Sequence, residues 1–174
     1  MSVVWSSAYT SAKGNCVPKS SIDRSRIRVK AMIIVVHEDG TRHLVSSNAP
    51  TDENPHGFHR LIGGSVELGE SLQEAIIREV DEELGARIHD LRHLGVVENI
   101  FHYNGELGHE LVALYKGRLD PTPADKGATL TESDGSVVPV VWRSLDDVDV
   151  HVPLYPVAVR PWIDSLGRHS RNNR

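Results

Sequence analysis

The chain has little of what marks secreted, membrane or nucleic-acid-binding proteins. Cys16 is the single cysteine in 174 residues, which excludes an internal disulfide and fits a reducing compartment. The longest aliphatic run, Ala31 to Val36, is far too short to cross a bilayer, and no hydrophobic signal segment opens the sequence. A formal charge of −5 argues against general nucleic-acid binding. We therefore expect a cytoplasmic protein with no membrane partner and no nucleic-acid partner.

Composition divides the chain into three regions, and no internal repeat is visible. Residues 1–25 are rich in serine and lack periodicity, so we expect a poorly ordered N-terminal tail. Residues 26–166 carry strand-like and helix-like patterns and are long enough to bury the core of one domain. Residues 167–174 are expected to be a polar C-terminal tail.

The most informative stretch runs from Gly64 to Ala86, GSVELGESLQEAIIREVDEELGA. Glu79, Glu82 and Glu83 are spaced i, i+3 and i+4, so one helix turn presents three carboxylates on one face. Like charges this close resist ionisation unless a cation compensates them. Oxygen ligands of this kind suit Mg²⁺ or Mn²⁺, and Mg²⁺ usually acts beside phosphate. The spacing suggests metal-dependent phosphate chemistry, but the glutamates taken alone fit the alternative better, a solvated acidic helix face, which is what most Glu-rich helix segments are.

Local signals define the helix that carries these glutamates. Ser71 followed by Glu74 forms a capping box and predicts a helix that begins at Leu72. Gly85 stands where a left-handed C-terminal cap is needed. An apolar stripe buries one side of the helix, and the glutamates lie about 100° round from it. The residues of the stripe are Leu72, Ile76, Val80 and Leu84.

Strand patterns surround this helix. Arg26 to His37 is expected to be a central strand, with Arg42 to Ser46 as its hairpin partner across the turn at residues 38–40. Asn104-Gly105 predicts a second β-hairpin, and a short helix is expected after the prolines of residues 153–166. The other expected strands are Phe58 to Ile62, Leu91 to Tyr103, Glu110 to Leu119 and Val137 to Trp142.

The stretch from Gly64 to Ala86 resembles the Nudix box, G-x5-E-x7-R-E-U-x-E-E-x-G-U, in which U is a bulky aliphatic residue. Only Ala86 falls short of the pattern, because it is smaller than the usual aliphatic. The matching positions are Gly64, Glu70, Arg78, Glu79, Glu82, Glu83 and Gly85. The resemblance implies an α+β fold, an α/β/α sandwich with a mixed β-sheet between helices.

The resemblance also implies a reaction, the hydrolysis of a phosphoanhydride in a nucleoside diphosphate linked to another group. The implied cofactor is Mg²⁺, with Mn²⁺ as an alternative, because such ions neutralise phosphates and lower the pKa of a bound water. The implied metal ligands are Glu79, Glu82, Glu83 and the carbonyl of Gly63. The residues expected to support the site are Gly64, Glu70 and Gly85. The family also commonly forms homodimers.

The catalytic residues implied by the resemblance are Glu82, Glu83, Arg78 and Glu132. Arg78 is expected to orient a glutamate through a charge-assisted hydrogen bond, and a surface ion pair with Glu74 or Glu82 fits the spacing equally well. The general base is either a box glutamate or an acid from a loop outside the box. Glu132 is the best outside candidate. Behind it stand Asp125, Asp134 and Glu110, and each of these acids has a solvated carboxylate as its alternative interpretation.

Hints about the substrate lie outside the box. The expected substrate-binding residues are Arg60, Tyr103 and Glu110. Tyr103 lies near the position where dinucleoside-polyphosphate hydrolases of the family often carry a tyrosine, which weakly favours nucleotide polyphosphates; a packing aromatic of the hairpin explains Tyr103 equally well. The alternatives are a nucleotide sugar, a non-nucleotide pyrophosphate, and a ligand sensor without turnover, against which the intact glutamates argue.

Two further features bear on the walls of the site. Arg26, Arg28 and Lys30 alternate along one strand and are interpreted as a solvated face rather than as phosphate ligands. The family's usual Leu-Pro-Gly-Gly is replaced by Leu61 to Gly64, LIGG. Ile62 restores a backbone donor that proline lacks, which is expected to reshape the wall beside the metal site.

Overall fold

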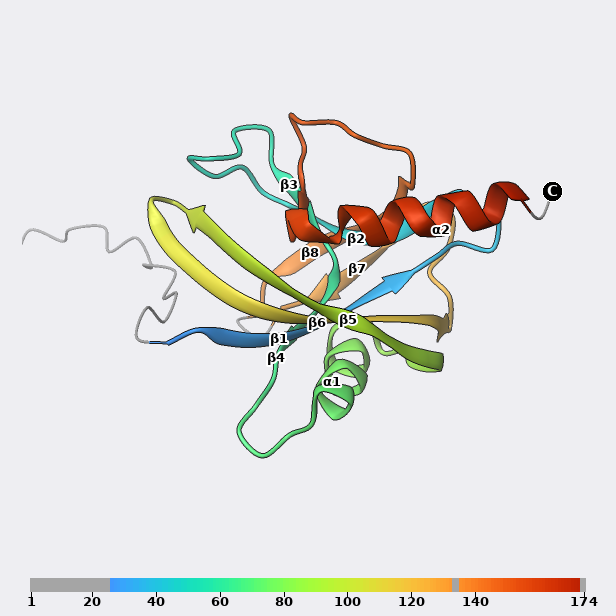
Figure 1. The fold of residues 1–174 in the computed structure, drawn as a ribbon, viewed down its shortest axis with the longest axis horizontal. Helices are drawn as coiled ribbons and strands as arrows, with labels where there is room; N and C mark the ends of the chain where they lie inside the picture. Colours follow the sequence, from blue (N-terminus) through green and yellow to red (C-terminus); the bar gives the residue numbers. More distant parts are fainter. Residues whose placement is uncertain (1–25, 133–134, 173–174) are drawn as a thin grey trace, which may run out of the picture.

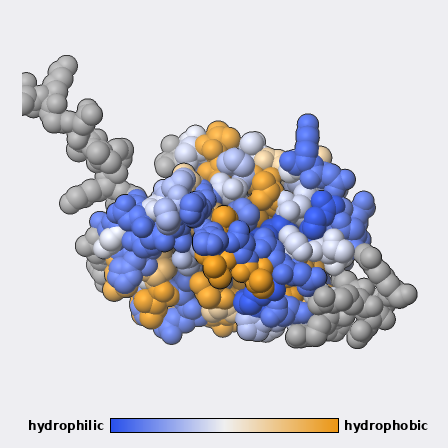
Figure 2. Space-filling model, turned by 90° about the horizontal axis from the view of Figure 1, so that it is seen from above, coloured by the Kyte–Doolittle hydropathy of each residue, from blue (hydrophilic) through white to orange (hydrophobic). Residues whose placement is uncertain are grey.

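The structure, a computed structural model, describes residues 26–132 and 135–172. The tail expected at residues 1–25 and the candidate base Asp134 lie outside these residues. In the part of the chain that is described, no helix has the length and apolarity needed to cross a membrane. The face seen from above mixes hydrophilic side chains with small apolar patches (Figure 2), an ordinary composition for a protein surface.

The described strands form two mixed sheets, one of order β4-β1-β6-β5 and one of order β7-β8-β2-β3-β9. The first contains β1 (Arg28–Val35), β4 (Ile62–Ser65), β5 (Arg87–Tyr103) and β6 (Glu106–Asp120). The second contains β2 (Arg42–Asn48), β3 (Phe58–Arg60), β7 (Ala128–Thr131), β8 (Val137–Ser144) and β9 (Leu154–Tyr155). The pairs β1–β6 and β3–β9 are parallel. The helical elements are α1 (Leu72–Leu84), the 3₁₀-helix η1 (Val157–Val159) and α2 (Arg160–Asn172).

Helices cover both faces of the first sheet (Figure 1). Side chains of β1 alternate between the faces, because successive residues of a strand point to opposite sides. Ala31 and Ile33 pack into the core that α1 covers, while Met32 and Ile34 pack into the core that reaches α2. Each fully buried aliphatic side chain of this kind contributes about 1.5–3 kcal/mol to folding. The predicted α+β sandwich with a mixed sheet between helices is confirmed. The structure contains a second mixed sheet in addition to the one between the helices.

Helix α1 follows the local signals closely. The capping box between Ser71 and Glu74 is present in both directions, and Gly85 ends the helix with φ of 60°. Ile76 and Val80 are fully buried, whereas the outer members of the stripe are only partly buried. Ala75 joins the buried side. The helix thus turns one apolar face to the sheet and leaves its glutamates at the edge of the core.

The predicted pairing of β2 with β1 is wrong. The turn forms, since the Gly40 N–H donates to the His37 carbonyl at 2.9 Å, but the two segments share only the isolated bridge between Val36 and His43. Strand β2 then pairs with β3 and β8 in the second sheet. The physical reason is that β6 pairs with β1 along its whole length and β4 occupies the other edge over Lys30 to Ile33, so β2 cannot extend its pairing back along β1.

The strand predicted from Phe58 to Ile62 is split at Leu61, where the chain passes from β3 in one sheet to β4 in the other. The Leu61 side chain is fully buried, and its N–H donates to the Tyr155 carbonyl at 3.2 Å. This short crossover places Arg60 beside the glycine loop that precedes α1. The hairpin at Asn104-Gly105 is confirmed, with β5 beginning several residues earlier than predicted.

Candidate active site

The box glutamates line a cavity of about 410 Å³, here called the acidic cleft. Glu79, Glu82 and Glu83 reach it from α1, and Glu132 reaches it from the segment that follows β7. The other charged residues that line the cleft are Lys30 of β1, Arg60 of β3, Glu67 of the loop before α1, and Arg78 of α1. Five acidic and three basic side chains from five segments therefore meet in one place, although only those on α1 are close neighbours in sequence.

Arg78 ties the acids of this cleft together. Its Nε and Nη2 donate to the two oxygens of Glu70 at 2.8 and 3.0 Å, the bidentate geometry that makes arginine–carboxylate pairs strong. Its Nη1 lies 3.0 Å from a Glu82 oxygen and 3.1 Å from a Glu79 oxygen. Its Nη2 also donates to the Ser65 carbonyl at 2.9 Å. The orienting bond and the ion pair with Glu82 are thus both present, and hydrogen bonds to Glu70 first of all raise the pKa of Arg78.

Glu74, the other predicted partner of Arg78, instead accepts a hydrogen bond from the Ser71 N–H at 2.9 Å. Glu70 does not line the acidic cleft. It binds Arg78 and accepts a hydrogen bond from the Glu67 N–H at 3.1 Å. Hydrogen bonds from Arg78 first, and then from Glu67, lower the pKa of Glu70. A supporting position for Glu70 agrees with these contacts.

Glycine is required at the first position of the box, Gly64, and at Gly63 just before it. A Cβ added at Gly64 would overlap the carboxylate of Glu79, so the absence of a side chain is what lets that carboxylate lie against the loop. Gly63 has φ of +126°, and a Cβ there would overlap the Ala31 carbonyl. The Gly63 carbonyl accepts a hydrogen bond from Arg60 Nη2 at 3.3 Å, which places this candidate metal ligand on the cleft side.

Glu83 is the most buried acid of the group, with 8% of its surface exposed. Its Oε2 is buried and has no hydrogen-bond partner in the structure. Burial first of all raises the pKa of this carboxyl to about 7; the charge of Arg60 opposes the rise, while Glu132 and Glu79 add to it. An unpartnered buried carboxylate oxygen is costly, and a cation beside it would remove that cost.

The described residues do not contain three acidic, histidine or cysteine side chains already gathered as a metal cage. Glu79 and Glu82 each pair with Arg78 Nη1 while they line the acidic cleft. The donor set nevertheless fits Mg²⁺, which prefers carboxylate and carbonyl oxygens. The unpartnered Oε2 of Glu83 supplies a ligand atom that no protein group satisfies.

The candidate general bases outside the box that the structure describes lie in three different cavities. Glu132 lies in the acidic cleft, with its Oε1 at 3.7 Å from Arg60 Nη2. Asp125 lines a different cavity, where its carboxylate is 2.8 Å from Arg42 Nη2 and 3.0 Å from His37 Nε2. Glu110 also lies elsewhere, in the pocket described next. Of the described candidates outside the box, the structure brings Glu132 to the box glutamates.

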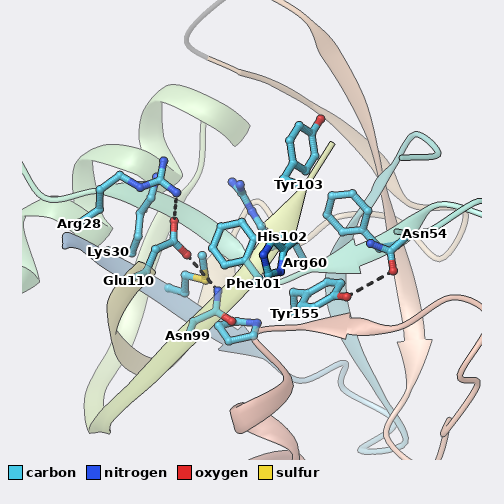
Figure 3. A pocket seen from close by; sticks show the side chains of 13 residues that line it. Arg28, Lys30, Asn54, Arg60, Asn99, Phe101, His102, Tyr103, Glu110 and Tyr155 are labelled. Carbon is cyan, nitrogen blue, oxygen red and sulfur yellow. Dashed lines mark hydrogen bonds and ion pairs between the residues drawn. The ribbon is translucent and has the colours of Figure 1, made fainter. Parts of the chain in front are cut away.

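Figure 3 shows the residues that line a second cavity of about 180 Å³, here called the aromatic pocket. It shares Lys30 and Arg60 with the acidic cleft. The aromatic rings that line the aromatic pocket are those of Phe58, Phe101, His102, Tyr103 and Tyr155. All three predicted substrate-binding residues, Arg60, Tyr103 and Glu110, line this pocket. Lys30 and Arg60 therefore lie between the carboxylates of the acidic cleft and the rings of the aromatic pocket.

The interpretation of Arg28 and Lys30 as a solvated strand face is wrong. The parallel register sets Arg28 opposite Glu110, and its Nη2 lies 2.8 Å from a Glu110 oxygen. Lys30 Nζ donates to Ser65 Oγ at 2.9 Å; burial first, and then the charge of Arg60, lower its pKa. Arg26, by contrast, is exposed. Both inward-facing cations line the aromatic pocket because this face of β1 looks into it.

A model of the NUDIX domain matches residues 26–165, which include the box and both cavities. The chain belongs to the Nudix family. The resemblance recognised in the stretch from Gly64 to Ala86 is therefore confirmed over most of the chain, and the acidic cleft is the part of this Nudix domain that the box builds.

Curated relatives of this Nudix domain include the NAD-capped RNA hydrolase NudC of Mycobacterium tuberculosis, 27% identical over 118 residues. That match covers 68% of the chain but only 33% of the relative, so the chain spans about a third of the length of such proteins. Among solved structures, a MutT NUDIX hydrolase from Burkholderia pseudomallei is 27% identical with a TM-score of 0.59, covering 80% of this chain and 97% of that one. The E. coli ORF135 protein, at 19% identity and a TM-score of 0.52 over 86% and 94% of the two chains, shows the shared fold.

The family's proline position in this Nudix domain is filled by Ile62. It pairs with Ile33 in the ladder between β4 and β1 and is fully buried, so its side chain packs in the core instead of shaping an exposed loop. The pocket residues that sequence reasoning missed are Asn54, Phe58, Asn99, Phe101 and Tyr155. Asn99, Phe101 and Tyr103 stand at alternate positions along β5, so the period of two in a strand was the signal that could have joined the first two to Tyr103. Asn54, Phe58 and Tyr155 come from separate segments, and no local pattern joins them.

Proposed function

We propose that this Nudix domain hydrolyses a phosphoanhydride bond in a nucleoside diphosphate linked to another group, with Mg²⁺ as its cofactor. One observation carries the proposal: the acidic cleft and the aromatic pocket share Lys30 and Arg60. A substrate with a flat ring at one end and phosphates at the other matches this order of rings, cations and carboxylates.

The carboxylates would hold the metal ion through Glu79, Glu82, Glu83 and the carbonyl of Gly63. Bound there, Mg²⁺ supplies positive charge to the phosphates and a water of lowered pKa. Glu132 accepts the proton of the attacking water at a carboxylate oxygen, since it is the described acid outside the box that lines the cleft.

The cations around the cleft divide the remaining work. Lys30 and Arg60 bind phosphate oxygens and orient the anhydride between ring and carboxylates. Arg78 keeps Glu79 and Glu82 in reach through its Nη1, while its bidentate pair with Glu70 fixes the guanidinium itself. The two roles are separate because Arg78 lies on α1, away from the aromatic pocket.

A dinucleotide of the NAD type is a second candidate substrate, favoured by the similarity to hydrolases of NAD-capped RNA. Both the single-nucleotide and the dinucleotide substrate contain a ring that fits the aromatic pocket. A nucleotide sugar would place its nucleoside there in the same way, whereas a non-nucleotide pyrophosphate has no ring to occupy it.

A substrate panel with Mg²⁺ tests the proposal. Nucleoside triphosphates, dinucleoside polyphosphates, NAD and nucleotide sugars are incubated with the protein, and the products are separated by chromatography. We expect cleavage of an anhydride in at least one class, and a loss of about 10²–10⁴ in kcat for Glu132→Gln. The matched control is Asp125→Asn, a carboxylate outside the cleft, which should retain activity. Binding without turnover across the panel would establish the sensor alternative instead.

A further inference from the structure

The inner end of the aromatic pocket is formed by a hydrogen-bonded chain of Arg28, Glu110 and Asn99. Arg28 Nη2 donates to Glu110 Oε1 at 2.8 Å, and Asn99 Nδ2 donates to Glu110 Oε2 at 3.1 Å (Figure 3). Glu110 is 5% exposed and Asn99 is 9% exposed. Partners on both sides hold these two side chains in place.

The chain also fixes which atoms remain available to a ligand. Because the Asn99 amide group donates to Glu110, its carboxamide oxygen points away from Glu110, toward the side of the pocket where Tyr155 lies (Figure 3). Each Glu110 oxygen is engaged once and keeps a second lone pair. The polar end of the pocket thus offers two neighbouring acceptors.

Phe101 forms a flat wall on the same strand. Its ring lies directly over Gly108, its partner on β6, and a Cβ added at Gly108 would overlap the ring. Such pairs can serve a hairpin alone, since an aromatic ring stabilises a facing glycine. Here the ring is only partly buried and lines the pocket, so it also presents a surface on which another ring can stack.

The outer side of the pocket is held by a contact between two loops. Glu53 accepts hydrogen bonds from the N–H groups of Asn104 and Gly105 at 2.9 and 2.8 Å. These bonds, that from Gly105 first, lower the pKa of Glu53. They join the loop of residues 49–57, which contributes Asn54, to the hairpin that contributes Phe101 and Tyr103. A ligand ring would be bounded by Asn54 from the loop and by the aromatic side chains of the hairpin.

Resting on the proposed function, we propose that the aromatic pocket binds the heteroaromatic ring of the substrate and selects rings that carry an exocyclic amino group. The ring stacks on Phe101, and the amino group donates its two hydrogens to the Asn99 oxygen and to Glu110. A carbonyl oxygen in the same place would face two acceptors with no hydrogen between them, so it is rejected. Adenine, guanine and cytosine carry such a group and uracil does not.

Two pairs of ligands that differ by one amino group test the selection. Adenosine monophosphate is compared with purine riboside monophosphate, and guanosine monophosphate with inosine monophosphate, by calorimetric titration of the wild-type protein without metal. We expect the amino-bearing member to bind about tenfold more tightly in at least one pair, as one lost hydrogen bond in a buried site implies. Equal affinities within both pairs would overturn the inference.

Variants locate the effect. In the ligand pair for which wild type shows a preference, Asn99→Leu should reduce the ratio of the two affinities to less than about twofold. Phe101→Leu should weaken the affinity for both ligands of that pair by on the order of tenfold, because stacking is lost. The matched control is Glu98→Gln, because Glu98 neighbours Asn99 but pairs with His109 at 2.9 Å and lines neither cavity. Its preference should equal that of wild type. A preference that survives in Asn99→Leu would refute the assignment.

The monophosphates contain no anhydride, so their binding is independent of turnover. Selective binding without hydrolysis of any anhydride would leave the pocket assignment standing and remove the proposed function. Hydrolysis without any preference for amino-bearing ligands would support the proposed function and refute the pocket assignment.

Discussion

Replacing Glu83 with glutamine is expected to stabilise the metal-free domain while removing its response to Mg²⁺. The folded protein raises the pKa of this carboxyl from 4.5 to about 7, chiefly through burial. Between these two values the folded state holds a proton that the unfolded state has lost. Stability contributed by the protonated form is therefore fully present below pH 4.5 and is lost as the pH rises through about 7.

The size of the effect follows from the two pKa values. A rise from 4.5 to about 7 corresponds to a penalty of about 3 kcal/mol at alkaline pH, at 1.36 kcal/mol per pKa unit. Solvent screens little of it, because the side chain is 8% exposed. Glutamine has the same shape and no charge, so Glu83→Gln should recover up to this amount, or roughly 6–12 °C in Tm.

Thermal unfolding at pH 5 and at pH 8.5, with and without Mg²⁺, measures this difference. Without metal, Glu83→Gln should exceed wild type in Tm at pH 8.5 and approach it at pH 5. With Mg²⁺, wild type should gain stability and the variant should not. The matched control is Glu82→Gln, whose carboxylate lies on the same helix but is 60% exposed and should gain nothing without metal. A variant that is no more stable than wild type at pH 8.5 would refute the reasoning.

Three further predictions concern the residues around the acids. Arg78→Lys loses the fork that binds several carboxylates at once, so kcat should fall about tenfold or more while circular dichroism stays unchanged. Gly64→Ala forces the Glu79 carboxylate away from the loop, and a Mg²⁺ titration followed by Tm should show metal affinity reduced by about tenfold or more; an unchanged midpoint would contradict this. Arg60→Met removes the charge that most opposes the raised pKa of Glu83, so the pH midpoint of the Mg²⁺ response should move upward by about one unit, and a downward shift would contradict the argument.

Local sequence signals predicted the parts of the fold that depend on neighbours along the chain. The capping box at Ser71 and the left-handed cap at Gly85 define α1, and both are formed by groups within four residues of each other. The hairpin at Asn104-Gly105 is of the same kind, since both residues adopt the positive φ that such a turn requires. These features need no knowledge of the rest of the molecule.

Pairings between distant segments were not predictable in this way. Arg28 and Glu110 are separated by 82 residues, and only the parallel register of β1 with β6 brings them together. The same register turned Arg28 and Lys30 inward, against the expectation from their charge. Glu132 lines the acidic cleft, whereas Asp125 pairs with Arg42 elsewhere. Loop sequences have no periodicity, so the sequence could not distinguish an acid that lines the cleft, such as Glu132, from one that lies elsewhere, such as Asp125.

The contact of Glu53 with the tip of the hairpin bears on how this protein tolerates changes in length. Surface loops ordinarily accept inserted or deleted residues at small cost. The segment of residues 49–57 must instead span a set distance, because the carboxylate of Glu53 meets two backbone N–H groups at the turn. One residue more or fewer would move that carboxylate out of register with Asn104 and Gly105. Natural variation and loop grafting should therefore preserve the length of this segment more strictly than its composition.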